Sequence, residues 1–295
     1  MKGKLKKAQV PLNCVMLLLF LACLLPFILL IVSSFTDEKA LLANGYNFIP
    51  AQFSLNAYAY LGTQFEMLAR SFLISIFSTA VGTTASLMIT TSLAYVLSRK
   101  DYPIRNILSF AVFFTMLFNG GLVPTYLMYT QGLGIKNTIF ALIVPSLLMN
   151  GFNVMIMKAY FSSNTPDEVR ESAYVDGAGE FRAFFQVVIP LAVPIIATIG
   201  LLTGISYWND WMNGLYYLTD SRLFSLQNVL NRILTDAQFL STNSFGTQTG
   251  DMISKVPTSA VRMAIAVIGV IPVMIAYPFF QKYFVKGITI GAVKG

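Results

Sequence analysis

The sequence predicts an all-α membrane protein with six transmembrane helices and both termini on the cytoplasmic side. Of its 295 residues, 56% are hydrophobic and only 11% are charged, whereas about a quarter of the residues of a soluble domain are charged. The apolar residues gather in six runs, each close to the ~20 residues that a spanning helix needs. The basic residues lie between these runs and favour one side. These three observations predict the fold class.

Six apolar segments predict the spans in order. The first follows four lysines and lacks a small-residue cleavage site, so we expect an uncleaved helix rather than a signal peptide. The third contains Asn119, Gly120 and Gly121, and the fourth contains Pro145 and Asn150. Because broken backbone at membrane depth is tolerated only against protein or a water-filled cavity, we expect these two spans to line a pathway, with ordinary helix kinks as the alternative. The predicted segments are 12–34, 71–97, 107–129, 138–160, 189–207 and 259–280.

The lysine and arginine residues predict the orientation, because cytoplasmic loops carry an excess of them. With the N-terminus inside, the inner segments hold 13 of these residues and the outer segments hold 7. The net charge of +7 therefore reports topology. The outer loops 35–70 and 208–258 are long and polar, and no soluble domain or internal repeat stands out. We expect one domain over 1–295.

The composition excludes several kinds of chemistry. The chain contains no histidine, so it has no Ser-His-Asp triad and no histidine metal site. Its two cysteines, Cys14 and Cys23, lie in one apolar run, and no stretch matches the GxxxxGK[ST] loop that cradles nucleotide phosphates. The charges are scattered at the ends of apolar runs, which argues against nucleic-acid binding. We therefore expect a chain that is not an enzyme and that binds no metal.

One inner loop departs from the basic trend. Between residues 161 and 188 it holds five acidic residues against two basic ones, a net charge of −3. Thr165 is placed to cap a helix, with Pro166 at its first position and Glu168 three residues after the cap. Gly177 is placed to end that helix, because glycine adopts the left-handed conformation without strain. A second short helix follows over 180–188 and ends near Pro190.

A longer pattern runs through this loop. It reads Glu171-Ser172-Ala173, three residues, Gly177, nine residues, and then Val-x-Ile-Pro ending at Pro190. It resembles the EAA loop of ABC importer permeases, whose form is Glu-Ala-Ala, three residues, Gly, nine residues, Ile-x-Leu-Pro. The chain departs from that form at positions 172, 187 and 189, by small or isosteric changes.

The resemblance implies that segment 161–190 is a coupling loop, which sits in a groove of a separate ATPase subunit and carries its movement to the membrane helices. Taken from the residues alone, a solvated amphipathic helix is the alternative. The residues that the resemblance places in this contact are Glu168, Glu171, Ala173, Asp176, Gly177, Ala178 and Pro190.

The last segment, 281–295, closely resembles the tail of carbohydrate importer permeases of the maltose-permease class, where it reaches between the two ATPase subunits. Without that resemblance, a frayed terminus would be expected. The runs 118–126, 133–138 and 152–157 resemble the LplC-like subgroup of these permeases, so the resemblance covers the whole chain. The tail residues implied in the ATPase contact are Lys286, Gly287, Gly291, Lys294 and Gly295.

The resemblance implies a permease subunit that imports a carbohydrate, with an oligosaccharide expected, by alternating access. It implies a second non-identical permease, two ATP-binding subunits and an extracellular solute-binding protein as partners, in the cytoplasmic membrane of a bacterium. ATP and Mg belong to the partner ATPases, and this chain is expected to bind no cofactor. A stand-alone secondary carrier or channel is the alternative. Such carriers commonly use buried Asp, Glu or His relays, and none lies mid-span here.

Aromatic and amide residues close the fifth span on the outer side. Sugars present apolar faces that stack on aromatic rings, and their hydroxyls need amide and carboxylate partners. An aromatic belt at the membrane interface is the alternative for the rings, and hydrogen bonds between helices are the alternative for the amides. The candidate pathway residues are Asn119, Asn153, Trp208, Asn209, Asp210, Trp211 and Tyr216.

Overall fold

The computed structural model describes residues 2–165, 167–243 and 258–292. These residues form helices, and they contain no β-strand beyond one isolated bridge between Thr36 and Phe53. The predicted all-α class is confirmed. The helices are α1 (Lys2–Ser34), α2 (Glu38–Asn44), α3 (Asn56–Gly62), α4 (Phe65–Ser98), α5 (Arg105–Leu117), α6 (Leu122–Leu127), η1 (Met128–Gly132), α7 (Phe140–Ile143), α8 (Gly151–Asn164), α9 (Asp167–Val175), α10 (Glu180–Ala183), η2 (Phe184–Val188), α11 (Ile189–Leu191), α12 (Val193–Trp208), α13 (Met212–Tyr217), η3 (Ser221–Leu223), α14 (Leu226–Asn243) and α16 (Thr258–Ala292).

Three helices of the described chain are long and apolar enough to cross a membrane alone. They lie in α1, α4 and α16 and match the first, second and sixth predicted spans. Two more segments pass the same test as bent pairs: α5 with α6 and η1, bent by 116°, and α10–α11 with α12, bent by 79°. The third and fifth predicted spans are therefore bent. The third breaks at Gly121, whose φ of 86° is left-handed, and the fifth breaks between Pro190 and Pro194, which lack the N–H groups that a continuous helix needs.

The fourth predicted span, 138–160, is not one continuous helix. α7 has only 4 residues and α8 has 14, so each is shorter than a bilayer crossing. Between them, Ser146 takes a positive φ of 63°. The Asn150 side chain then starts α8 by accepting a hydrogen bond from the Asn153 N–H at 3.1 Å. The interruption occurs where Pro145 and Asn150 predict it, but it separates two helices instead of bending one.

The chain divides into two compact units. Unit 1 comprises residues 1–67 and 230–272. Within it, the Glu38 carboxylate accepts hydrogen bonds from the N–H groups of Ser259 and Ala260 at 2.9 and 2.8 Å. These N–H groups have no partner inside the helix, so Glu38 caps the start of α16 from 221 residues away. The apolar side chains of α1 are exposed over residues 11–28.

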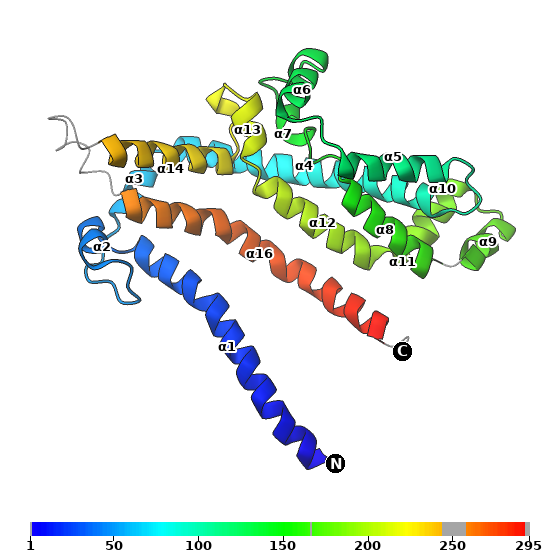
Figure 1. Ribbon diagram of the computed structural model, residues 1–295, viewed down its shortest axis with the longest axis horizontal. Helices are drawn as coiled ribbons and strands as arrows, with labels where there is room; N and C mark the ends of the chain where they lie inside the picture. Colours follow the sequence, from blue (N-terminus) through cyan, green and yellow to red (C-terminus); the bar gives the residue numbers. More distant parts are fainter. Residues whose placement is uncertain (1, 166, 244–257, 293–295) are drawn as a thin grey trace. The chain divides into compact units, whose positions relative to one another are not determined.

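Unit 2 comprises residues 68–229 and 273–295. In it, α5 and α12 both contact α8, and α4 contributes to the same apolar core (Figure 1). α4 and α12 approach closely at Gly82, where an added Cβ would lie 2.5 Å from the Tyr207 ring. The apolar core of this unit joins these four helices to η2, so it anchors the loop that contains α9–α11. Its fully buried members include Leu97, Val154, Met157, Phe161, Val188 and Ile199.

Candidate functional site

Helix α9 ends in a well-formed glycine terminus. Gly177 has a φ of 80°, its N–H donates to the Tyr174 carbonyl at 3.0 Å, and the Ala178 N–H donates to the Ala173 carbonyl at 2.9 Å. These two bonds are the paired contacts of a Schellman motif. The predicted end of the helix at Gly177 is therefore present. Ala173, Asp176 and Ala178 lie in this terminus and set the direction in which the chain leaves α9.

The start of α9 differs from the expectation. Within the described residues, the Thr165 hydroxyl is buried and has no hydrogen-bond partner, so it makes no capping box. Thr165 instead ends α8, and its N–H donates to the Phe161 carbonyl at 3.1 Å. A residue before proline is pushed toward extended backbone, and Thr165 adopts φ −122° and ψ 85°. The same residue thus closes the preceding helix instead of capping the next.

Five of the seven predicted contact residues are exposed, whereas Ala173 and Ala178 are half-buried. Glu168, Glu171 and Asp176 are exposed, as are Gly177 and Pro190.

Sequence reasoning missed two apolar side chains beside them: Val175 is 87% exposed and Phe181 is 81% exposed. Val175 closes α9 and Phe181 lies in α10. Large apolar side chains exposed beside charged ones are typical of protein-binding surfaces. The sequence offered one signal of this exposure: both residues lie close to Gly177, which ends the helix.

A polar network attaches the loop to the end of α4. The Arg99 guanidinium forms ion pairs with Glu180 at the start of α10 and with Asp101. The hydrogen bond from Arg99 lowers the pKa of Asp101 to about 2. Burial opposes the ionisation of Glu180, but Arg99, Tyr174 and Tyr95 together outweigh it and keep the pKa of Glu180 below its usual value. The sequence marks Glu180 as one of the loop's acids, but it does not show that its partner lies 81 residues earlier.

The tail residues are only partly described. The backbone of Lys286, Gly287 and Gly291 continues α16 as a helix. Lys294 and Gly295 lie outside the described residues. The role of this segment stays a prediction.

Three residues after the fifth predicted span, Trp208, Asp210 and Asn213, are buried or half-buried. Asp210 accepts a hydrogen bond from the Asn213 N–H at 3.2 Å, and the Asn213 amide donates to the Pro145 carbonyl at 3.0 Å. Burial raises the pKa of Asp210, and its second carboxylate oxygen has no hydrogen-bond partner within the described residues. Trp208 is only 6% exposed and packs edge-on against Phe72.

The other pathway candidates are spread over several elements. Trp211 is 38% exposed, Asn209 is exposed and Tyr216 is half-buried. Asn119 lies at the break of the third predicted span, where its side chain accepts from the Gly121 N–H at 2.9 Å. Asn153 donates to the Thr203 hydroxyl at 3.4 Å, which joins α8 to α12. Asn209, Asp210 and Trp211 are thus consecutive in one segment. Asn119 and Asn153 lie elsewhere and form hydrogen bonds with Gly121 and Thr203.

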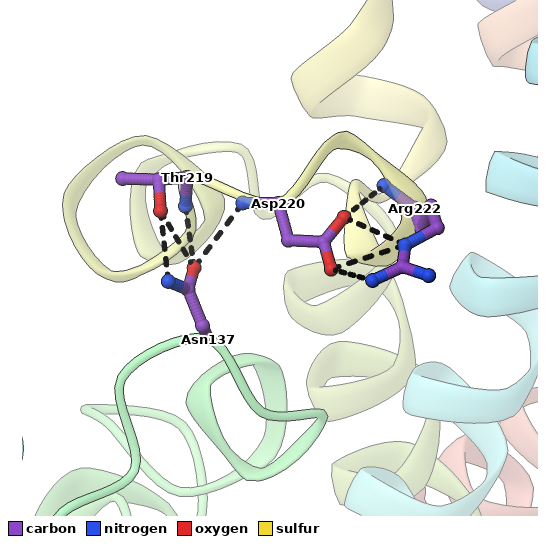
Figure 2. A network of polar contacts seen from close by, with 4 residues as sticks. All are labelled: Asn137, Thr219, Asp220 and Arg222. Atoms are coloured by element: carbon purple, nitrogen blue, oxygen red, sulfur yellow. Dashed lines mark hydrogen bonds and ion pairs between the residues drawn. The ribbon is translucent and has the colours of Figure 1, made fainter.

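A second polar network, which sequence reasoning also missed, involves Asn137, Thr219, Asp220 and Arg222 (Figure 2). The side-chain oxygen of Asn137 accepts hydrogen bonds from the Thr219 and Asp220 N–H groups at 2.6 and 3.2 Å. Its amide nitrogen donates to the Thr219 hydroxyl at 2.8 Å. Asp220 pairs with Arg222 at 2.9 Å. Through these hydrogen bonds, the side chain of Asn137 joins the loop before α7 to the loop after α13. The backbone of Asn137 is left-handed, with a φ of 54°.

Comparisons with known proteins agree with this architecture. Residues 103–290 match the family model of the binding-protein-dependent transport system inner membrane component. The chain is 39% identical to the polygalacturonan/rhamnogalacturonan transport system permease protein YtcP of Bacillus subtilis (strain 168), over 95% of this chain and 96% of that protein. It is 38% identical to protein LplC of the same organism, over 92% and 90% of the two chains.

A solved structure is similar over nearly the whole length. It comes from a bacterial ABC transporter involved in the import of the acidic polysaccharide alginate, with a TM-score of 0.77 and 31% identity. The match covers 94% of this chain and 97% of the other. With the family model matching 103–290 and relatives matching over nearly their full length, the chain belongs to the family of inner membrane permease components of binding-protein-dependent ABC transport systems.

Proposed function

We propose that this chain is one permease subunit of an ATP-driven oligosaccharide importer and forms half of its translocation pathway. The transport of polygalacturonan and rhamnogalacturonan named for YtcP, and the import of alginate named for the structural relative, support a carbohydrate substrate with several sugar units. The described residues contain no group of three metal-binding side chains. Catalysis is assigned to the partner ATPases, which bind ATP and Mg.

The observation that carries the proposal is the loop 161–190. α9 presents Glu171 to solvent, and the apolar side chains of Val175 and Phe181 are exposed beside it. An exposed apolar pair inside an acidic loop suits a groove on another protein. The EAA pattern and the family membership support an ATPase subunit as the owner of that groove. Glu168, Ala173, Asp176, Gly177, Ala178 and Pro190 shape the same element.

The proposed topology has six crossings with both termini in the cytoplasm. α1, α4 and α16 supply three crossings and the two bent pairs supply two more. The broken segment α7–α8 supplies the sixth. The excess of lysine and arginine on the proposed inner side supports this orientation. The protein then lies in the cytoplasmic membrane of a bacterium as a single transmembrane domain over 1–295.

The proposed assembly contains a second, non-identical permease, two ATP-binding subunits and an extracellular solute-binding protein. The exposed apolar side chains of α1 suit lipid or the second permease. The tail 281–295, including Lys286, Gly287, Gly291, Lys294 and Gly295, is proposed to reach the ATPase subunits.

The proposed sugar contacts lie at the outer end of the fifth span. Trp211 offers an exposed ring. Asp210 keeps one carboxylate oxygen without a hydrogen-bond partner among the described residues, but this oxygen is buried and has to be uncovered before a sugar hydroxyl can donate to it. Asn209 and Tyr216 lie in the same segment. The burial of Trp208 supports a packing role for its ring. Asn119 and Asn153 are second-rank candidates, because both already hold neighbouring backbone or side-chain groups.

The experiment is reconstitution of the purified complex in proteoliposomes with its solute-binding protein. Glu171→Lys should leave the complex assembled and abolish uptake driven by ATP. Ser172→Ala is the matched control, because it changes the neighbouring position to the family's alanine and should keep uptake. Normal ATPase stimulation and uptake in Glu171→Lys would reject the coupling role. Uptake by this chain alone under an ion gradient would instead establish a secondary carrier.

A further inference from the structure

Arg99 occupies a junction between the end of α4 and the loop. It directly follows Ser98, the last residue of α4, and its side chain is 17% exposed. One guanidinium nitrogen donates to Glu180, and the other two donate to Asp101. Arginine presents its donors in a rigid fork, so the geometry of such a contact is fixed as well as its charge. Arg99 therefore sets where α10 lies relative to the end of α4.

Tyr95 makes a second contact between the same two helices. It lies one helical turn before Arg99, on the same side of α4, and is buried. Its hydroxyl donates to Glu180 at 3.4 Å, and its ring packs against Phe184 with 4.8 Å between the centroids. The Arg99 guanidinium lies 6.0 Å from the centre of the Tyr95 ring. Glu180 is thus held both by α4 and by the residue that follows it.

Arg105 extends the junction to a third helix. This residue begins α5, and its guanidinium donates to the Arg99 carbonyl at 3.3 Å. The end of α4 and the start of α5 are therefore joined through the residue that also holds the loop.

Close packing is missing on the α9 side of the junction. A cavity of about 290 Å³ lies there, lined by Tyr95, Lys100, Phe161, Ser163 and Arg170 among others. Interiors that transmit a displacement do so because they are densely packed. Beside this cavity, the side chain of Tyr174 in α9 still lies close to Tyr95 and Glu180. The approaches of α9 and α10 to the end of α4 therefore meet at Glu180 and Tyr95, and Arg99 holds Glu180 there.

We propose that Arg99 is the positioning residue through which movement of the coupling loop reaches α4: the Arg99–Glu180 ion pair makes α4 follow α10 when the ATPases close. This inference rests on the proposed function and assigns a mechanical role to a residue outside the loop. Phe184 keeps the loop attached by apolar contact when the pair is broken. The Arg99–Glu180 ion pair fixes the direction in which α10 can move α4.

The test uses the full complex in proteoliposomes and measures sugar taken up per ATP hydrolysed. Arg99→Gln and Glu180→Gln should each lower that ratio about tenfold, which corresponds to about 1.4 kcal/mol. The double variant should be no worse than either single variant, because both remove the same contact. Arg99→Lys keeps the charge but loses the forked donors, so its ratio of uptake to hydrolysis should lie between those of wild type and Arg99→Gln. Arg182→Gln is the matched control, since Arg182 lies in α10 and donates to Gln186 within the loop.

The outcomes separate this inference from the proposed function. If the wild-type complex couples uptake to ATP hydrolysis, and Glu180→Gln keeps the wild-type ratio, the role of Arg99 is refuted while the proposed function stands. Equal losses in Arg182→Gln, or fully additive losses in the double variant, would also refute it. If Arg99→Gln fails to assemble, Glu180→Gln decides the matter, because its side chain is 53% exposed.

Discussion

Replacing Gly177 by alanine adds one methyl group at the end of α9, and we expect it to loosen that end. Gly177 has a φ of 80°, and a Cβ placed there would meet no atom within 4 Å. Steric overlap with neighbours therefore contributes nothing. The whole effect comes from the left-handed backbone conformation, which costs an L-residue about 1–2 kcal/mol.

That cost has a measurable consequence. The N–H groups of Gly177 and Ala178 are held by the Tyr174 and Ala173 carbonyls. A loss of about 1–2 kcal/mol changes a local opening equilibrium by roughly fivefold to thirtyfold. We expect amide hydrogen exchange at these positions to accelerate by that factor in the intact complex, while the exchange of α4 and α12 stays unchanged.

Gly179→Ala is the matched control. A Cβ at Gly179 would likewise meet no atom within 4 Å, but the φ of −76° at this position suits any L-residue. This variant should leave exchange in α9 unchanged or slightly slower, since alanine reduces the freedom of the unfolded chain. Equal acceleration in both variants, or none in Gly177→Ala, would show that the left-handed helix end at Gly177 does not exist in the protein.

Three further predictions concern other contacts. Glu38→Gln removes the charged cap of α16 and should lower stability by about 1–2 kcal/mol, seen as a lower melting temperature in detergent. Gly82→Ala places a Cβ 2.5 Å from the Tyr207 ring and should cost about 1–3 kcal/mol by overpacking, measured the same way. The third concerns pH: the pKa of Asp101 falls from 3.8 to about 2 beside Arg99, so its contribution is present above pH 3.8 and is lost as the pH falls toward 2. The melting difference between wild type and Asp101→Asn should therefore be constant between about pH 7 and pH 5; a difference that shrinks within that range would contradict the lowered pKa.

The sequence predicts those parts of the fold that depend on local patterns. Long apolar runs specify α1, α4 and α16, and prolines and glycines specify where the other spans break. Gly177 ends α9 as expected, because few residues other than glycine take that conformation without strain. Thr165 is the instructive failure. A threonine before proline fits both a helix end and a helix start, and the preceding helix α8 takes it.

The contacts that hold the site together could not be predicted in the same way. Arg99 reaches Glu180, and Asn137 reaches Thr219, across 81 and 82 residues. Helical periodicity shows which face of one segment is apolar, but it carries no information on which distant polar group lies opposite. Exposure is equally hidden, since Val175 and Phe181 look like core residues until the loop is folded.

The break between α7 and α8 connects these observations, because its carbonyl groups need partners. A broken helix inside a membrane leaves carbonyls that only neighbouring protein groups can satisfy. The Ile143 carbonyl accepts from the Tyr207 hydroxyl at 2.7 Å, and the Pro145 carbonyl accepts from the Asn213 amide at 3.0 Å. Tyr207 lies in the last turn of α12, and Asn213 lies in the following helix α13. If the loop 161–190 couples as proposed, a displacement that enters α12 from it carries the break along, since separating the two would leave buried carbonyls without hydrogen bonds.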